Sequence, residues 1–304
     1  MHARRCILIT GATGFIGSYL ARRLAHTDYD VHILVRTEPS STFLNTFRDR
    51  LVIHRIGRET GTLANLLQKV QPTLVFHLAA YFVAEHGPDD LERLINSNIL
   101  FSTQLFEAMA QTGSDAIVSV GTSWQHNQQD DYDPASLYAA TKQAAEDLLV
   151  FYCNAKGIRN ITLKLFESYG PHDPRQKLFN LLRAASHSVV PIKFSPGHQL
   201  LDLVYVEDIV DAFEIAGDLV LGVKRGSNAS YGVSSGELVS LRSLVKTYEV
   251  VSGRHPNIEW GGRPYRAREV MRPWRPSHSL PGWSPRTDLV SGIHQTIAAE
   301  GPVE

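Results

Sequence analysis

Short apolar runs alternate with amphipathic stretches along the first half of the chain. The runs are rich in β-branched residues and have the length of buried strands, whereas the stretches between them repeat apolar residues at helical spacing. Strands are predicted at residues 6–10, 31–35, 51–56, 73–80, 116–120 and 161–166. Helices are predicted up to residue 25 and at 63–70, 96–109 and 134–156. Because each link is short, this alternation predicts an α/β fold with a doubly wound parallel sheet.

A glycine motif follows the first predicted strand. Gly11, Gly14 and Gly17 occur in the order Gly-Ala-Thr-Gly-Phe-Ile-Gly and lead directly into a helical stretch. Between a strand and a helix, this spacing is typical of a loop that lets the backbone approach a pyrophosphate at the helix N-terminus. The sequence therefore predicts a Rossmann fold that binds a dinucleotide.

The second predicted strand ends at Arg36. At this position an acidic residue would accept hydrogen bonds from the ribose of NAD, whereas a cation suits the 2′-phosphate of NADP. Arg36 therefore favours NADP, unless it is a surface arginine and the determinant lies elsewhere. Ser40 and Ser41 could add hydroxyl donors to the same phosphate.

Candidate site residues follow the fourth and fifth strands. Small side chains at the end of the 73–80 run let a flat cofactor pass over the sheet, and His77 just before them is interpreted as structural. The fifth strand leads into Thr122 and Ser123. A hydroxyl at a strand's carboxyl end can hydrogen-bond a substrate carbonyl, and Thr122 is the favoured candidate.

A tyrosine and a lysine occur at helical spacing in the predicted helix 134–156. Tyr138 and Lys142 are four residues apart, so the phenol and the ammonium lie one turn apart and can point into one cleft. A fixed cation beside a phenol stabilises the phenolate and lowers its pKa. The pair is therefore a candidate for proton transfer.

The pattern of apolar and turn-forming residues changes after residue 166. The segment 167–174 is rich in turn-forming residues, and the remainder alternates short apolar pieces with glycine, proline and arginine. We predict a dinucleotide-binding Rossmann domain at residues 1–168 and a smaller α/β lobe at 169–304 that closes over the crevice. Residues 202–217 are expected to return to the first domain.

Composition narrows the class of protein. The 304 residues are 43% hydrophobic and 20% charged, which is ordinary for a soluble globular enzyme, and a net charge of −1 gives no case for nucleic acid or an anionic membrane. Because no apolar run reaches the roughly 18 residues that span a bilayer, we expect a cytoplasmic protein. The histidines are scattered, so no metal site is expected, and Cys6 and Cys153 are interpreted as core residues.

The motifs resemble the extended short-chain dehydrogenase/reductase family of nucleotide-sugar epimerases, dehydratases and ketoreductases. The matching segments, in family order, are 11–17, 77–80, Asn98, Thr122, Tyr138 with Lys142, 169–171 and 204–208. Segments 121–126, 137–147 and 163–174 are most similar to the branch that contains CDP-abequose synthase and related 4-keto-6-deoxyhexose reductases.

The resemblance implies an NADPH-dependent ketoreductase that reduces the C4 ketone of a nucleotide-linked 4-keto-6-deoxyhexose to the alcohol. Tyr138 would act as general acid, Lys142 would hold the ribose and lower the tyrosine pKa, and Thr122 would position the ketone oxygen. The implied cofactor-binding residues are Gly11, Thr13, Gly14, Phe15, Ile16, Gly17, Arg36, Leu78, Ala79, Ala80, Asn98, Tyr138, Lys142 and Phe166. The implied substrate-binding residues are Thr122, Ser123, Trp124, Glu167, Lys177, Arg266 and Arg268, with Arg175 as a weaker candidate.

The partner that the resemblance implies is a nucleoside-diphosphate sugar, bound by the lobe at 169–304. Relatives commonly dimerise through two helices per subunit, so we expect a homodimer formed by the helices at 96–109 and 134–156. Phe106, Leu149 and Phe151 fit this interface as outward apolar residues, and they equally fit ordinary core packing.

Two other functions stay open. A nucleotide-sugar 4-epimerase with tightly bound NAD would use the same three catalytic residues, although Arg36 argues against it. A non-catalytic NADP-sensing module is the minor alternative, since it would need none of the three. A 4,6-dehydratase is disfavoured because no acid/base pair follows Thr122.

The chain departs from the family pattern at several positions. Residues 124–126, Trp-Gln-His, occupy the region after the fifth strand where relatives more often carry Val-Tyr-Gly. Glu167 stands where relatives often carry Asn, Leu201 where they carry Arg, and Arg58 where they carry an acidic residue. Because these positions lie near the bound ligands in relatives, their substrate and adenine contacts do not transfer directly to this chain.

Overall fold

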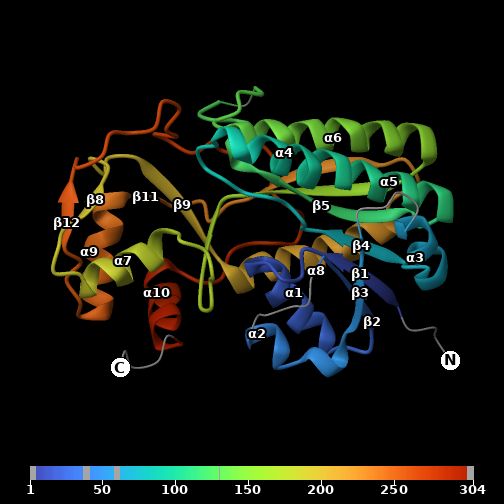
Figure 1. The fold of residues 1–304 in the computed structure, drawn as a ribbon, viewed down its shortest axis with the longest axis horizontal. Helices are drawn as coiled ribbons and strands as arrows, with labels where there is room; N and C mark the ends of the chain where they lie inside the picture. Colours follow the sequence, from blue (N-terminus) through green and yellow to red (C-terminus); the bar gives the residue numbers. More distant parts are fainter. Residues whose placement is uncertain (1–4, 37–41, 58–61, 130, 300–304) are drawn as a thin grey trace.

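The structure is a computed structural model that describes residues 5–36, 42–57, 62–129 and 131–299. Within these residues, seven parallel strands form the main sheet in the order β10-β6-β5-β4-β1-β2-β3 (Figure 1). The strands are β1 Cys6–Thr10, β2 Asp30–Val35, β3 Val52–Arg55, β4 Leu74–His77, β5 Ala116–Thr122, β6 Arg159–Leu165 and β10 Asn228–Val233. The predicted doubly wound α/β fold is confirmed.

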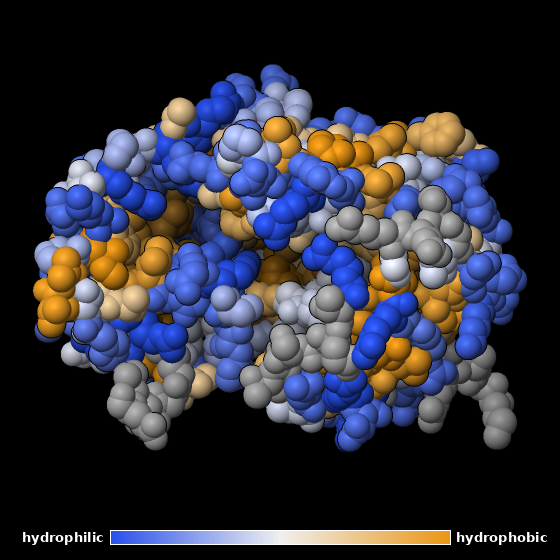
Figure 2. Space-filling view, viewed as in Figure 1, coloured by the Kyte–Doolittle hydropathy of each residue, from blue (hydrophilic) through white to orange (hydrophobic). Residues whose placement is uncertain are grey.

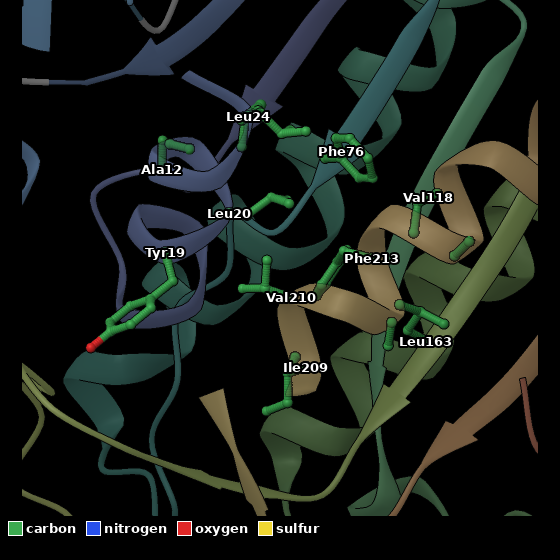
Figure 3. Close-up of a cluster of buried hydrophobic side chains, with 14 of the residues drawn as sticks. Ala12, Tyr19, Leu20, Leu24, Phe76, Val118, Leu163, Ile209, Val210 and Phe213 are labelled. Atoms are coloured by element: carbon green, nitrogen blue, oxygen red, sulfur yellow. The ribbon is translucent and has the colours of Figure 1, made fainter. Parts of the chain in front are cut away.

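Helices cover both faces of this sheet. α1 Phe15–Ala25 and α8 Val206–Gly222 pack on one face, and α3 Thr62–Val70, α5 Phe101–Thr112 and α6 Leu137–Lys156 pack on the other (Figure 1). Figure 3 shows how Leu20 and Phe213 of the two first-named helices meet Phe76 and Leu163 of the sheet. Because both faces of the sheet centre are buried, the inner strands are largely apolar runs, which is why the sequence predicted them.

The rest of the chain builds a smaller lobe beside this domain. It holds a three-stranded sheet, β11-β9-β7, and a two-stranded sheet, β12-β8. The strands are β7 Glu167–Tyr169, β8 Ile192–Phe194, β9 Leu200–Tyr205, β11 Leu238–Ser240 and β12 Ile258–Trp260. The helices are α7 Leu178–His187, α9 Leu241–Ser252 and α10 Leu289–Ala298. A separate apolar core, with Phe179, Leu182 and Leu244 among its buried residues, stabilises the lobe.

Two segments late in the chain lie against the main domain. α8 follows β9 directly and packs on the main sheet, and β10 pairs with β6 as the seventh strand. The sequence analysis did not predict β10. Its burial alternates over the first four residues and becomes continuous only at Gly232 and Val233, so its pattern is weak.

Short elements complete the fold. They are α2 Thr42–Asn45, α4 Leu91–Leu94, the 3₁₀ helices η1 Arg48–Arg50, η2 Pro88–Asp90 and η4 Ser123–Gln125, and the π-helical turn η3 Ile95–Leu100. The continuous helix predicted at 96–109 is therefore wrong in detail, because a π-helical turn precedes α5. π-Helical turns are frequent at functional sites.

The catalytic-helix candidate, α6, begins later than predicted. Ser136 is its N-cap: the Ser136 backbone is extended and its hydroxyl accepts a hydrogen bond from the Ala139 N–H at 3.2 Å. Gly157, in the left-handed conformation at φ 76°, ends the helix. Tyr138 therefore lies in the first turn of α6, close to the end that faces the cleft.

Two of the three residues considered for a dimer interface are core residues. Phe106 and Leu149 are each 1% exposed and pack between the sheet and the α5/α6 layer, so the outward orientation considered for them is wrong. Phe151 is 57% exposed. Cys153 is buried in the same core, and Cys6 is half-buried, as interpreted. Among the described helices, none has the length and apolar character that crossing a membrane requires.

Candidate active site

A large cleft lies between the main domain and the lobe. Its main cavity, about 1410 Å³, is lined by the glycine motif on one side and by α7, β8 and β9 on the other. A smaller cavity of about 170 Å³ lies at the carboxyl ends of β4, β5 and β6. Figure 2 shows the surface hollowed between the two parts of the molecule. In doubly wound sheets this edge is where ligands bind.

The glycine motif has the geometry of a phosphate loop. Gly11 has φ +75°, and a Cβ there would lie 2.6 Å from the Ala79 backbone nitrogen. A Cβ on Gly17 would lie 2.2 Å from the Gly11 carbonyl oxygen, so both positions require glycine. Gly14 is the N-cap of α1, and no side chain caps this helix end. Its N–H groups are therefore available to a phosphate.

Predicted cofactor residues line both cavities. Gly11, Gly14, Phe15, Ile16, Gly17, Leu78, Ala80 and Phe166 line the smaller cavity, and Thr13 and Arg36 line the larger one. Ala79 packs against Gly11. Arg36 is exposed just after β2. Ser40, Ser41 and Arg58 lie outside the described residues.

A chain of hydrogen bonds holds the end of β4 in place. The Ala79 N–H donates to the Thr10 hydroxyl at 3.2 Å, and that hydroxyl lies 2.7 Å from His77 Nδ1. His77 Nε2 lies 2.9 Å from the Ser102 hydroxyl, which donates to the Asn98 carbonyl. Burial lowers the pKa of His77 to about 3, with a further contribution from the charge of Lys142. His77 is therefore neutral and structural, with its proton on Nε2.

Asn98 is fully buried in the π-helical turn. Its oxygen accepts from the Tyr81 N–H at 2.7 Å, and its amide donates to the Tyr81 carbonyl and to the Thr141 hydroxyl. The side chain thus ties the loop after β4 to the residue that precedes Lys142. This geometry makes Asn98 a positioning residue for the site, rather than a direct contact to the cavity.

Two of the three catalytic candidates line the smaller cavity. Thr122 and Tyr138 line it, and Lys142 lies one turn further along α6, buried. Burial raises the pKa of Tyr138 to about 12, while Arg175 lowers it and Glu167 raises it. Lys142, which was expected to lower this pKa, is not among the groups that shift it in this structure. Tyr138 keeps its proton at neutral pH.

Lys142 has a perturbed pKa of the opposite sign. Burial lowers its pKa to about 8, and the charge of Glu146 raises it. A buried cation loses its proton more readily than it would in water. The negative charge of Glu146 opposes this loss because it stabilises the ammonium. Lys142 is consequently still mostly charged at neutral pH.

A polar network behind Thr122 connects it to α6. The Thr122 N–H donates to Gln125 Oε1 at 2.8 Å, and Gln125 Nε2 donates to Glu146 at 2.8 Å. Lys164 Nζ lies 3.7 Å from Glu146 and 2.7 Å from His126 Nε2. The sequence analysis did not predict these roles for Gln125, Glu146 and Lys164, whose contacts join three elements distant in sequence.

Aromatic and charged side chains form the outer wall of the cavity. The Phe82 ring lies 4.9 Å from the Tyr138 ring and 5.8 Å from the Trp124 ring. Glu167 and Lys177 form an ion pair with 3.0 Å between Oε2 and Nζ. Ser123 lines the same cavity. Phe82 follows a predicted strand, but no pattern in the sequence identified it.

The two arginines predicted for the substrate have different surroundings. Arg266 lines the larger cavity, forms two hydrogen bonds with Glu269 at 3.0 and 2.6 Å, and lies 4.9 Å over the Trp124 ring. Arg268 pairs with Asp133 and donates to the Pro134 carbonyl, so it joins the lobe to the main domain. Further cations line the larger cavity that the sequence analysis did not identify: Arg183, Lys193 and Arg263.

Arg175 is already engaged within the protein. Its guanidinium binds Asp173 through two nitrogens, at 2.7 and 2.6 Å, and lies 4.6 Å over the Phe15 ring. It therefore places a fixed positive charge beside the glycine motif. Among the described residues, no group of three or more His, Cys, Asp or Glu side chains is arranged to hold a metal ion.

A phosphate loop next to a protonated tyrosine and a charged lysine defines a dinucleotide-dependent enzyme of the oxidoreductase type. The chain belongs to the NAD dependent epimerase/dehydratase family, whose sequence profile matches residues 7–224. The family predicted from the sequence is thereby confirmed.

Alignments with known proteins cover most of this chain. CDP-abequose synthase of Yersinia pseudotuberculosis is 27% identical over 274 residues, covering 88% of this chain and 91% of the relative. UDP-glucose 4-epimerase of Mycolicibacterium smegmatis is 27% identical, covering 95% and 96%. The solved structure of MoeE5 in complex with UDP-glucuronic acid and NAD is 26% identical, with a TM-score of 0.81 and coverage of 97% and 98%.

Proposed function

We propose that the protein is an NADPH-dependent ketoreductase that reduces the C4 ketone of a nucleotide-linked 4-keto-6-deoxyhexose. The observation that carries this proposal is the position of Tyr138. This half-buried phenol, which keeps its proton at neutral pH, lines a cavity next to the phosphate loop together with Thr122. Reduction of a ketone requires an acid at this place.

The residues of the cleft fit a bound dinucleotide. The glycine motif leaves room for a pyrophosphate at the N-terminus of α1, and small residues after β4 leave room for a flat ring over the sheet. NADPH would supply the hydride. Thr122 would orient the ketone oxygen, Tyr138 would protonate it, and the Lys142 ammonium would bind the ribose hydroxyls.

NADPH is proposed over NADH because of Arg36. Its side chain is exposed after β2 and lines the same cavity as Thr13, where a 2′-phosphate would be bound. NADH remains the less favoured cofactor. The substrate partner is a nucleoside-diphosphate sugar, whose diphosphate the lobe cations would neutralise.

A nucleotide-sugar 4-epimerase with tightly bound NAD is the second candidate. It is favoured by the relatives, because one is named UDP-glucose 4-epimerase and the MoeE5 structure contains NAD. The minor candidate, a non-catalytic NADP-sensing module, would leave Tyr138 at the cavity and the buried Lys142 without a function.

We further propose a homodimer through the layer of α5 and α6. Phe151 on α6 is exposed, as are three apolar residues before α5: Leu91, Ile95 and Leu100. Figure 2 shows apolar residues along this edge of the molecule. Exposed apolar side chains of this size favour burial against a second subunit.

The test of the reductase function follows nicotinamide absorbance. The purified protein is mixed with NADPH or NADH and with CDP- or dTDP-4-keto-6-deoxyglucose, and we expect stoichiometric oxidation of NADPH with one of them. Tyr138→Phe should lower turnover by roughly 10²–10⁴-fold, the usual contribution of a general acid, while NADPH still binds. Tyr132→Phe, at an exposed tyrosine, is the matched control.

Other outcomes separate the candidates. No oxidation with either sugar, together with NAD that co-purifies with the protein, would favour the epimerase. Tight NADPH binding without turnover of any ketosugar would favour the sensing module. A Tyr138→Phe variant that keeps most of its activity would contradict the role of Tyr138.

A further inference from the structure

The Glu167–Lys177 ion pair lies at the reaction cavity itself. Both residues line the cavity of about 170 Å³ that contains Thr122 and Tyr138. Their side chains keep 30% and 23% of their surface accessible. Glu167 begins β7 and Lys177 precedes α7, so the lobe holds both at fixed positions. The pair therefore offers one acceptor and one donor to a ligand.

The surroundings place the pair close to the reacting group. Lys177 Nζ lies 4.8 Å from the centre of the Phe82 ring, and that ring lies 4.9 Å from the Tyr138 ring. The charge of Glu167 reaches Tyr138, whose pKa it raises. Burial would raise the pKa of Glu167, but the cations Lys177, Arg175 and Arg266 lower it. Glu167 is therefore an ionised acceptor.

An acidic side chain is unexpected in a cleft for two anionic ligands. A carboxylate repels the phosphates of a dinucleotide and of a nucleotide sugar, so it can only face an uncharged part of them. At the reaction cavity, the uncharged parts are the reduced nicotinamide and the sugar ring, and the sugar ring is the one that carries hydroxyl groups. We propose that Glu167 and Lys177 bind a ring hydroxyl beside the reacting carbonyl and restrict the substrate to neutral, hydroxylated hexoses; this inference rests on the proposed reductase function.

The same two charges disfavour other sugars. A hexuronate carboxylate would compete with Glu167 for Lys177 and lie beside a like charge, and an amino-sugar ammonium would compete with Lys177 for Glu167 in the same way. A ring that lacks the hydroxyl would leave both charged groups without the partner they had in water. Sites built to hydrogen-bond a hydroxyl discriminate strongly against analogues that lack it.

The experiment compares matched sugars on wild type and Glu167→Gln. Kinetics with NADPH use the accepted 4-keto-6-deoxyhexose and its 3-deoxy counterpart, and calorimetry compares binding of UDP-glucose with UDP-glucuronic acid. For wild type we expect roughly 10²-fold higher kcat/KM with the hydroxylated sugar, and tighter binding of UDP-glucose. Glu167→Gln should shrink both ratios, because an amide neither accepts as strongly nor repels a carboxylate.

Controls keep these results interpretable. Glu237→Gln removes an exposed carboxylate of the lobe and should leave both ratios unchanged. Lys177→Met tests the donor of the pair independently and should also lower the preference for the hydroxylated sugar. Thermal unfolding of each variant verifies that it is folded.

Several results would overturn the inference. Equal kcat/KM for the two ketosugars in wild type would do so while leaving the reductase function intact. Equal binding of UDP-glucose and UDP-glucuronic acid would do so even if no ketosugar is reduced. Solvent deuterium entering the carbon beside the ketone, in wild type but not in Glu167→Gln, would instead assign Glu167 to proton abstraction.

Discussion

Arg36 is the residue on which the proposed cofactor preference depends. Its guanidinium stands at the carboxyl end of β2 and lines the main cavity. Arg36→Ala should raise the KM for NADPH by roughly 10–100-fold, because a hydrogen bond between charged groups contributes about 1.5–3 kcal/mol. The KM for NADH should change little, since NADH has no 2′-phosphate. Steady-state kinetics with both cofactors measure this.

The matched control for this prediction is Arg50→Ala, at an exposed arginine of η1. Equal losses with NADPH and NADH would mean that Arg36 supports the adenosine site generally. Unchanged kinetics with both would place the determinant of cofactor preference elsewhere.

At the residue scale, the sequence predicted local patterns well and electrostatics poorly. Tyr138 and Lys142 are one helical turn apart, so their proximity follows from spacing alone. The hydrogen bond between Arg266 and Glu269 also joins residues close in sequence. The sequence does not show, however, that Arg266 rather than Arg268 lines the larger cavity. The pKa of Tyr138 depends on burial by residues from several elements, which no local pattern reveals.

Three elements meet behind Thr122 and Lys142, the residues proposed to be catalytic. Gln125 in η4, Glu146 in α6 and Lys164 in β6 are connected by hydrogen bonds and an ion pair. Glu146 is also the group that raises the pKa of Lys142 against the effect of burial. We expect Glu146 to act as a positioning residue that keeps Lys142 charged.

Glu146→Gln tests this role through the pH dependence of kcat/KM. Lys142 is charged below its pKa, which burial lowers to about 8, so activity that needs the cation falls as pH rises through that value. Loss of the carboxylate lowers this pKa further, so the fall should occur at lower pH. A fall of about one pKa unit would lower the charged fraction of Lys142 at pH 8 from about one half to about one tenth, so we expect roughly fivefold lower activity than wild type at pH 8 and near wild-type activity at pH 6.

The control for this variant is Asp147→Asn, which removes an exposed charge from the next position of the same helix. Its pH profile should match that of wild type, because water screens an exposed charge. A Glu146→Gln variant with uniformly low activity at every pH would indicate a purely structural role for Glu146.

At the scale of elements, strand length decided what could be predicted. Five of the six strands found from the sequence are largely buried on both faces of the main sheet and read as apolar runs, whereas β3 is a partly exposed edge strand. β7, β8, β11 and β12 have three residues each, too few for a periodic signal. β10 was missed because its polar first half carries no apolar run, although it pairs with β6 in register.

At the scale of the whole molecule, the lobe and the cofactor loop are in direct contact. The Tyr19 hydroxyl donates to the Pro171 carbonyl at 2.8 Å, and the Phe43 ring stacks on His172 at 5.0 Å. Arg175 of the same lobe segment covers Phe15. The segment that begins the lobe therefore touches both α1 and α2.

The proposed dimer makes the last prediction at this scale. Phe151 is 57% exposed on the outer face of α6, which would face the partner subunit. Phe151→Glu places a carboxylate in the proposed apolar interface. Because burial of an unpaired charge costs free energy, this variant should associate much more weakly. Light scattering coupled to size exclusion should give a dimer for wild type and a monomer for the variant.

The control for this prediction is Val250→Glu, at a valine of α9 that is 85% exposed on the lobe; this variant should stay dimeric. A monomeric wild type, or a Phe151→Glu variant that is still dimeric, would contradict this interface, and a monomer that keeps its activity would show that each active site is complete within one chain.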